Sequence, residues 1–162
     1  MSVKPIFFAL DGKSIKEFEK QLDILKDHIY GVKVGLELFT SEGPSCVEQL
    51  KSDGWVVFLD LKLHDIPETV YKSIKTLNDV DFGFLTIHGQ GGKSMIQKAK
   101  MAADEIKSKP KIMMVTILTA LNDDDLKTMG NNSTVNEQVE KLSKVAKEME
   151  VGVVCSGKEA KF

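Results

Sequence analysis

Short apolar runs alternate along the chain with charged segments, and each run has the length of a buried β-strand. The runs are rich in Val, Ile and Phe and lack regular polar alternation, which is typical of strands in a parallel sheet covered by helices. They occupy residues 6–10, 29–34, 55–59, 82–87, 112–118 and 151–155. The pattern predicts a repeated βα unit.

Two of the segments between these runs have clear helical spacing. Residues 14–28 place Ile15, Phe18, Leu22 and Leu25 on one face. Residues 135–149 do the same with Val139, Leu142, Val145, Ala146 and Met149. An apolar stripe of this kind faces the core, and the opposite polar face lies in water. Both segments are predicted to be amphipathic helices.

Proline and glycine mark further helix boundaries. Pro67, with Glu68 in the following turn, predicts the start of a helix. Gly54 and Gly152 fall where helices are expected to end before the next strand. Helix ends and apolar runs therefore alternate in the order that βα units require.

The strands begin roughly 25 to 30 residues apart until residues 122–134 add a polar insertion, and this spacing predicts a (β/α)8 TIM barrel. A complete barrel takes about 250 residues, whereas this sequence has 162. We therefore expect an α/β fold with about six βα units in one domain over residues 1–162, incomplete at its C-terminal end. The edges of the first and sixth strands should then be exposed and able to pair with another chain.

Composition and charge narrow the range of partners. With 42% hydrophobic and 28% charged residues, the chain has the composition of a globular domain. The formal net charge of −2 provides no basic field for nucleic acid or membrane, and the first apolar run is too short to span a bilayer. Cys46 and Cys155 show no disulfide framework or zinc-ligand spacing. We expect a soluble cytoplasmic protein with reduced thiols.

Charged residues gather where the third apolar run ends. Asp60 and Lys62 lie two positions apart, so strand alternation predicts that they share one face, with Leu61 and Leu63 on the other. Asp65 follows on the next loop. Because active sites of (β/α)8 barrels lie at the carboxyl ends of the strands, this position favours a catalytic role.

Two further charges occupy comparable positions. Asp11 directly follows the first apolar run, and Lys33 lies inside the second. A buried lysine requires a partner, so we expect two lysines and three carboxylates to form one alternating network that can move a proton. Any one of these residues alone would more often be a solvated rim residue or a helix cap, but their coincidence favours a site.

Other polar groups have simpler interpretations. The GQGG sequence at 89–92, after His88, would suit a phosphate nest, but a glycine-rich turn into a helix is favoured. The three acids at 123–125 more often cap a helix than hold a metal. His28 and His64 show no metal-ligand spacing and are interpreted as structural.

The stretch 60–70, DLKLHDIPETV, closely resembles the DxKxxDIPxTV motif of orotidine 5'-phosphate decarboxylases. The resemblance extends over the whole chain through FALD at 8–11, VKVG at 32–35, TIH at 86–88, VTILT at 115–119 and VVCS at 153–156. It implies a (β/α)8 barrel and an enzyme without cofactor or metal. The implied reaction converts orotidine 5'-monophosphate to uridine 5'-monophosphate and CO2 in pyrimidine biosynthesis.

The resemblance also implies roles for a tetrad of charged residues, Lys33, Asp60, Lys62 and Asp65. Lys62 would stabilise a carbanion at C6 of the pyrimidine and donate a proton to it. Asp65 would reach the site of a neighbouring subunit. The expected assembly is therefore a homodimer.

Substrate-binding residues carry over by the same resemblance. Asp11 and Lys33 would contact the ribose hydroxyls, Ile66 and Thr69 would complete the partner's site, and Thr119 would lie beside the pyrimidine ring. Ala120 stands where the family usually has a small hydroxyl residue that bonds to the base, so the sequence departs from the family's pattern at this position.

One part of the family's site has no match in this sequence. The family holds the substrate phosphate with a glutamine loop and a Gly-Arg pair on the seventh and eighth βα units. Remote phosphate binding supplies energy that assists the chemical step, so we expect 162 residues alone to be badly impaired and to be part of a longer enzyme.

Two alternatives remain open. A magnesium-dependent sugar-phosphate lyase of the same superfamily shares the Asp-x-Lys-x-x-Asp motif, but it typically carries an acid where Lys33 stands. The second alternative is a non-catalytic fragment that kept only the charged residues at the strand ends.

Overall fold

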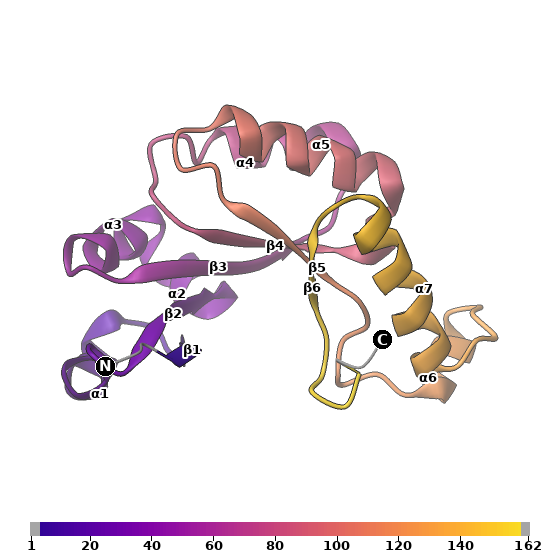
Figure 1. Cartoon of the computed structure of the whole chain (residues 1–162), viewed down its shortest axis with the longest axis horizontal. Helices are drawn as coiled ribbons and strands as arrows, with labels where there is room; N and C mark the ends of the chain where they lie inside the picture. The colour runs from indigo at the N-terminus through magenta and orange to yellow at the C-terminus, as the bar shows by residue number, and fades with distance from the viewer. Residues whose placement is uncertain (1–3, 160–162) are drawn as a thin grey trace.

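The computed structural model describes residues 4–159 and contains one parallel six-stranded sheet that curls into an open arch (Figure 1). The strands are β1 (Lys4–Leu10), β2 (Ile29–Gly35), β3 (Val56–Leu63), β4 (Phe84–His88), β5 (Lys111–Val115) and β6 (Gly152–Val154). Each pairs with the next in sequence order, which leaves β1 and β6 at the two edges. The predicted βα repeat and the six barrel units are confirmed. The predicted domain limits include residues 1–3 and 160–162, which lie outside the described residues.

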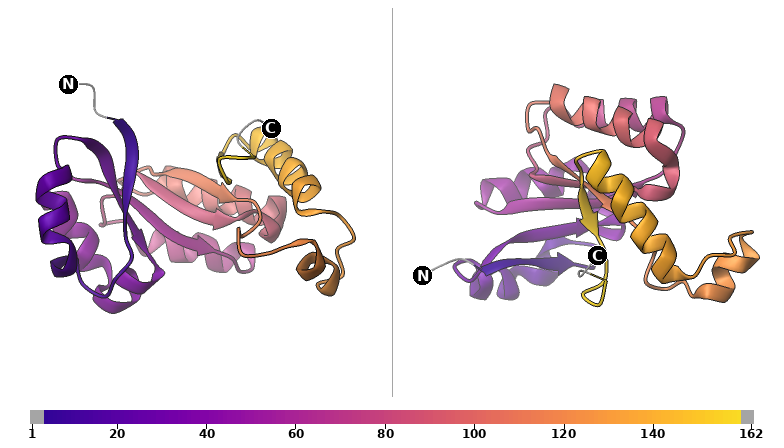
Figure 2. Two further views of the ribbon diagram at one scale, coloured as in Figure 1. Left: turned by 90° about the horizontal axis from the view of Figure 1, so that it is seen from below. Right: turned by 45° about the vertical axis from the view of Figure 1, so that its right-hand side comes forward.

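Most helices cover the convex side of the sheet, but the short helix over residues 123–128 projects away from it (Figures 1 and 2). They are α1 (Glu19–Leu25), α2 (Leu36–Glu42), α3 (Pro44–Ser52), α4 (Pro67–Lys75), α5 (Gly92–Glu105), α6 (Asp123–Thr128) and α7 (Val135–Glu148), with short 3-10 helices η1 (Ile15–Phe18) and η2 (Gly89–Gly91). Pro67 begins α4, as predicted. Within residues 4–159, no helix is both long and apolar enough to cross a membrane.

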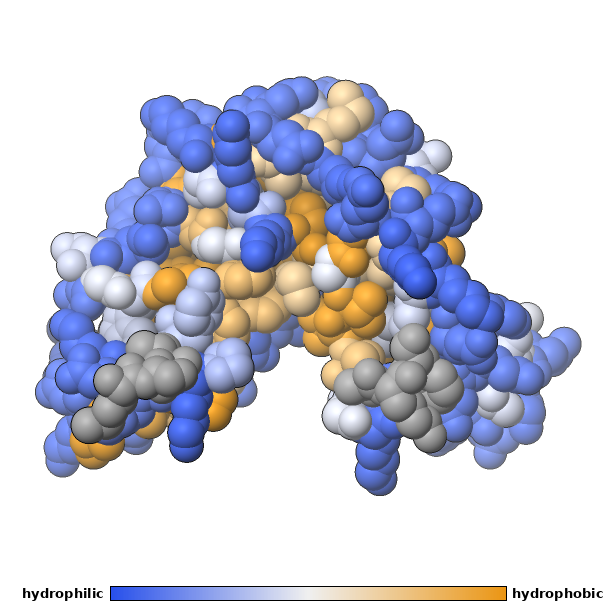
Figure 3. Space-filling model, in the orientation of Figure 1, coloured by the Kyte–Doolittle hydropathy of each residue, from blue (hydrophilic) through white to orange (hydrophobic). Residues whose placement is uncertain are grey.

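The two faces of the sheet carry different side chains. Toward the helices, Val57 and Leu59 of β3 are fully buried in the main core. On the concave face, the rings of Phe7, Phe58 and Phe84 pack with centroids 5.3–5.5 Å apart. Apolar residues are visible in the hollow of the arch (Figure 3). The concave face thus has an aromatic layer. The next side chains on this face, toward the carboxyl ends of the strands, adjoin that layer.

Several predicted boundaries are wrong by a few residues. The fourth strand begins at Phe84 rather than at residue 82, and the fifth ends at Val115 rather than at residue 118. The fifth ends early because Ile117 packs in a second, smaller core cluster with Leu126 and Val139. The first predicted helix is split into η1 and α1 by the non-helical backbone of Phe18, and α1 ends at Leu25.

Of the two glycines predicted to follow the end of a helix, only one does so. Gly54 follows α3 in the left-handed region with φ of 87°, as expected of a residue that ends a helix. Gly152 instead begins β6, and Glu150 takes the left-handed position after α7. A Cβ on Gly152 would lie 2.3 Å from the Met113 sulfur of β5, so this glycine permits close strand packing.

Gly31 of β2 lies so close to β3 that a side chain would not fit. A Cβ at this position would lie 2.2 Å from the backbone oxygen of Val56, its partner in the register. We expect Gly31→Ala to lower the free energy of unfolding by about 3 kcal/mol, because the two strands must separate to admit the methyl group. Urea denaturation measures this loss.

Gly83→Ala is the matched control, since its nearest neighbours would be 3.4 and 3.8 Å from the added Cβ. It should change the free energy of unfolding by less than about 1 kcal/mol. Equal losses in the two variants would contradict the role assigned to this close approach.

Candidate active site

Two lysines converge on one carboxylate at the carboxyl end of the sheet. The ammonium nitrogen of Lys33, on β2, lies 2.8 Å from Asp60 Oδ2, and that of Lys62, on β3, lies 2.9 Å from Asp60 Oδ1. We call Lys33, Asp60 and Lys62 the charged cluster. The sequence prediction that these three side chains meet agrees with the structure.

The charged cluster is positioned between the core and solvent. Asp60 is only 6% exposed, whereas the side chains of Lys33 and Lys62 are 30% and 34% exposed. Burial raises the pKa of Asp60, but the hydrogen bonds and charges of the two lysines outweigh it and hold this pKa below its usual range. Asp60 is therefore ionised at neutral pH. One carboxylate between two ammonium groups leaves an excess positive charge, which suits an anion or a developing negative charge.

Regular strand alternation does not explain how Lys62 reaches Asp60. The pairing of β3 with β4 shifts register between Leu59 and Leu63, and Lys62 has a positive φ of 50°. The strand is bulged at this point, and bulges redirect side chains beside functional sites. The contact was predicted, but it depends on a backbone irregularity that the pattern does not reveal.

Thr86 on β4 is a polar contact of the charged cluster that the sequence analysis missed. Its side chain is fully buried, and its hydroxyl donates to Asp60 Oδ1 at 3.0 Å and accepts from the backbone N–H of Lys62 at 2.8 Å. A threonine in an otherwise apolar run was the available signal. It went unused because threonine is common in strands for packing reasons alone.

The predicted network of five charges is smaller in the structure. Within residues 4–159, neither Asp11 nor Asp65 forms an ion pair with a lysine. Asp11 is exposed beyond the end of β1, and its carboxylate lies over Gly35. Asp65 is exposed on the loop before α4, where its Oδ1 accepts the backbone N–H of Ile66 at 2.6 Å. Within residues 4–159 of one copy, the ion pairs therefore join three of the five predicted charges and do not include Asp11 or Asp65.

The remaining candidate residues lie at the rim. Ile66 is 66% exposed and Thr69 is exposed at the start of α4. Thr119 is exposed on the loop after β5, where it helps to line a pocket of about 510 Å³ with Leu121 and Val135. Hydrogen bonds within residues 4–159 do not connect these three residues to the charged cluster. Their predicted roles with substrate or partner stay predictions.

Two histidines stack beside Lys62. The rings of His64 and His88 lie 5.0 Å apart at 18°. Burial, followed by the nearby His64 and Lys62, lowers the pKa of His88, and its Nδ1 accepts the backbone N–H of Gln90 at 3.3 Å. His88 is therefore neutral at pH 7 and ends β4 where the GQGG sequence turns through η2 into α5. The prediction of a glycine-rich turn is confirmed.

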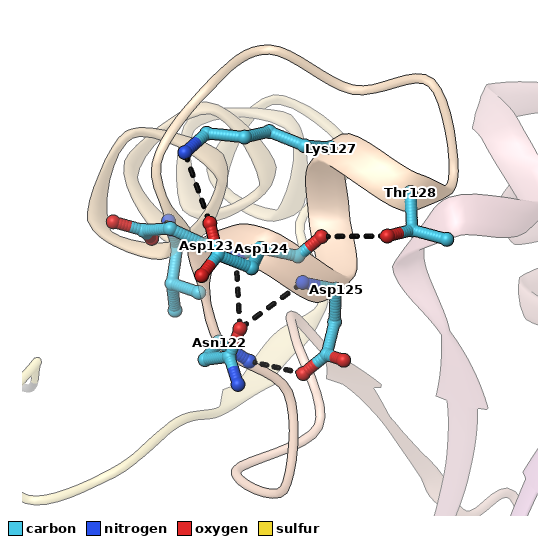
Figure 4. Close-up of polar contacts among 7 residues, drawn as sticks. Asn122, Asp123, Asp124, Asp125, Lys127 and Thr128 are labelled. Atoms are coloured by element: carbon cyan, nitrogen blue, oxygen red, sulfur yellow. Dashed lines mark hydrogen bonds and ion pairs between the residues drawn. The ribbon is translucent and has the colours of Figure 1, made fainter.

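The three consecutive acids form the first turn of α6, which Asn122 caps (Figure 4). Asn122 Oδ1 accepts the backbone N–H groups of Asp124 and Asp125, and the Asp125 carboxylate accepts the backbone N–H of Asn122. Asp123 accepts the backbone N–H of Val135 and so ties α6 to the start of α7. This reciprocal arrangement is a capping box, and the preferred interpretation of these acids is confirmed.

Comparison with known proteins places this geometry in a family. Residues 4–162 match the profile of the Orotidine 5'-phosphate decarboxylase / HUMPS family. An orotidine 5'-phosphate decarboxylase of Saccharophagus degradans is 39% identical over 155 residues, 95% of this chain and 65% of the relative. One from Buchnera aphidicola is 40% identical over 157 residues, 96% of this chain and 66% of the relative.

A solved structure gives the same result in three dimensions. The crystal structure of orotidine 5'-phosphate decarboxylase from Lactobacillus acidophilus superposes with a TM-score of 0.85 at 38% identity, covering 98% of this chain and 74% of that one. The chain thus spans about 65% of the length of the first curated relatives. Sequence profile, relatives and fold agree, and the chain belongs to the orotidine 5'-phosphate decarboxylase / HUMPS family.

Proposed function

We propose that this chain carries the charged part of an orotidine 5'-phosphate decarboxylase site, which converts orotidine 5'-monophosphate to uridine 5'-monophosphate and CO2. The observation that carries the proposal is the Asp60 carboxylate held between the Lys33 and Lys62 ammonium groups, at 2.8 and 2.9 Å. The names of the relatives support the same reaction.

The proposed chemistry needs only the side chains of the charged cluster. When the bond between C6 and the carboxylate breaks, CO2 leaves and the electron pair stays on C6 of the pyrimidine. The Lys62 ammonium stabilises this charge and then donates a proton to C6, becoming a neutral amine that recovers a proton from solvent. Asp60 holds the Lys62 ammonium in place through their ion pair, and Lys33 satisfies the second carboxylate oxygen.

Substrate contacts are proposed for the rim. Asp11, beyond the end of β1, and Lys33 would bind the ribose hydroxyls, and Thr119 would lie beside the pyrimidine ring. The position of Asp11 over Gly35, next to the charged cluster, supports the first of these assignments. A cytoplasmic location stays a prediction from the sequence.

A second copy of the chain is the proposed partner. Asp65, Ile66 and Thr69 are exposed on and beside the loop that follows β3, so they are accessible to another subunit. In the proposed homodimer, Asp65 reaches the partner's charged cluster, while Ile66 and Thr69 complete the partner's substrate pocket. The side chain of Ile66 is 66% exposed, so it is free to be buried against a second copy.

The charged cluster gives the magnesium-dependent lyase less support. Both oxygens of Asp60 are paired with ammonium groups, and a divalent cation would have to displace them to reach this carboxylate. Lys33 occupies the strand position where the lyase typically carries an acid.

The test of function is a decarboxylation assay on two proteins. One is the chain itself. The other, here called the joined protein, is this chain followed by the part of the Lactobacillus acidophilus protein that it does not cover. We expect the joined protein to release CO2 from orotidine 5'-monophosphate at a rate that a chelator does not change, and the chain alone to be much slower.

Other outcomes would reject the proposal. Magnesium-dependent cleavage of a ketose phosphate would establish the lyase. A joined protein that folds but acts on neither substrate would favour the non-catalytic alternative.

A further inference from the structure

Thr86 contacts both Asp60 and Lys62, the two charged residues in the bulge of β3. Its hydroxyl accepts the backbone N–H of Lys62 at 2.8 Å and donates to Asp60 Oδ1 at 3.0 Å. Asp60 Oδ1 is also the oxygen that pairs with the Lys62 ammonium, at 2.9 Å. One fully buried hydroxyl is thus bonded to the backbone of the lysine and to the side-chain partner of that lysine.

The donor and acceptor roles in this arrangement are fixed by chemistry. A backbone N–H can only donate, so the Thr86 oxygen must accept from Lys62. An ionised carboxylate can only accept, so the single Thr86 proton must point to Asp60. The hydroxyl therefore has one orientation, and both of its bonds are used at once.

The register explains why Thr86 is needed here. Leu59 pairs with Leu85 and Leu63 with Ile87, so β3 uses four residue steps where β4 uses two. Thr86 is the β4 residue between these pairs and lies opposite the bulge. Lys62 meanwhile holds a left-handed backbone with φ of 50°, which non-glycine residues adopt only when surrounding contacts enforce it. The bond from the Lys62 N–H to Thr86 is such a contact.

We propose that Thr86 is a positioning residue, whose hydroxyl holds the β3 bulge so that the Lys62 ammonium is directed onto Asp60. Its catalytic consequence rests on the proposed function, because Lys62 is the proposed proton donor. Its structural consequence, the placement of Lys62, is independent of any substrate.

The first test uses the chain without substrate. Thr86→Val keeps the shape of the side chain and removes the hydroxyl, so the Lys62 amide should exchange with D2O at least about 10-fold faster, followed by NMR. Acetylation of the Lys62 amine, followed by mass spectrometry, should accelerate as its ion pair loosens. Thr86→Ser should restore both rates to within about threefold of the wild type, because serine retains the hydroxyl.

Thr116→Val is the matched control. Thr116 is also fully buried, and its hydroxyl donates to the backbone oxygen of Val154 at 3.3 Å, away from the charged cluster. This variant should leave both Lys62 rates unchanged. Unchanged rates in Thr86→Val, or equal acceleration in both valine variants, would overturn the proposal.

If Thr86→Val does not fold, Thr86→Cys replaces it. A thiol is a weak hydrogen-bonding group, so the Cys variant should exchange the Lys62 amide faster than the Ser variant. Equal exchange in the two would overturn the proposal.

The second test measures catalysis in the joined protein. Thr86→Val should lower kcat about 100-fold with a smaller change in KM, because Lys62 is misplaced while substrate contacts remain. Thr86→Ser should recover most of kcat. A wild-type joined protein that does not decarboxylate, but whose Lys62 amide is protected by Thr86, would reject the proposed function and retain the positioning role. Normal kcat in Thr86→Val would reject the catalytic consequence alone.

Discussion

Replacing Lys62 with alanine should lower the decarboxylation rate of the joined protein at least about 10⁴-fold while uridine 5'-monophosphate still binds. The loss is large because one ammonium group is proposed both to stabilise the carbanion and to donate its proton. Asp60 keeps its ion pair with Lys33 at 2.8 Å, so the fold should survive. Single-turnover decarboxylation and nucleotide titration measure the two effects separately.

Lys93→Ala is the control for losing a lysine from an ion pair. Lys93 lies 2.7 Å from Glu148, but both side chains are more than half exposed. This variant should leave the rate unchanged, since exposed pairs contribute little. A rate in Lys62→Ala within about 10-fold of wild type would remove Lys62 from its proposed role.

The Lys62→Ala variant also provides a test of the proposed dimer. An equal mixture of Lys62→Ala and Asp65→Asn chains, unfolded and refolded together, should regain activity in about a quarter of the sites. The mixed dimer has one site with both native residues if Asp65 comes from the partner. If mixed dimers form but activity does not return, then Asp65 either acts in the site of its own subunit or takes no part in the reaction.

Asp60→Asn should impair both stability and rate. The amide keeps the shape of the carboxylate but not its charge, so Lys33 and Lys62 would repel each other beside a group that no longer compensates them. We expect a loss of about 1–2 kcal/mol in the free energy of unfolding, a moderate value because both lysines are about one third exposed. The rate should fall at least about 100-fold, because Lys62 loses the carboxylate that holds its ammonium group in place.

Acid should reproduce the effect of this substitution on stability. The pKa of Asp60 is lowered in the folded protein because two lysines outweigh the effect of burial. Its stabilising contribution is therefore complete above the unfolded-state pKa of about 3.9 and is lost as the pH falls below that value. The difference in unfolding free energy between wild type and Asp60→Asn should shrink from pH 7 to about pH 3.

Asp79→Asn provides the comparison. Asp79 pairs with Lys107 on the surface, and both side chains are largely exposed. Urea denaturation of this variant should differ little from wild type at either pH. A difference between wild type and Asp60→Asn that stays constant down to pH 3 would contradict the assigned charge state of Asp60.

The sequence was sufficient for the order of strands and for the central ion pairs. Apolar runs of strand length are decisive when each is followed by a helix, and Lys33 was recognisable because a charge in such a run needs a partner. Strand ends were less predictable, because Ile117 continues the apolar pattern of β5 while packing in a separate cluster. The local sequence does not show whether an apolar residue such as Ile117 belongs to the strand or to a separate cluster beyond it.

The backbone geometry around Lys62 could not be predicted from the pattern. A period of two predicts which residues share a face, but it does not reveal the register shift between Leu59 and Leu63 or the positive φ of Lys62. Thr86 acquires its role only from that shift. Asp11 and Asp65 lie outside the ion pairs within residues 4–159 of one copy, because position at a strand end does not determine where a loop side chain points.

The aromatic layer of the concave face has a consequence for electrostatics. Phe58 and Phe84 stand two positions before Asp60 and Thr86 on the same face of their strands, so rings adjoin the charged cluster on its amino-terminal side. Hydrocarbon screens charge poorly, whereas the partly exposed Lys33 and Lys62 side chains are also screened by water. A flat heterocycle that displaced this water would lower the local dielectric, and the field of both lysines would act on it more strongly than in the open site.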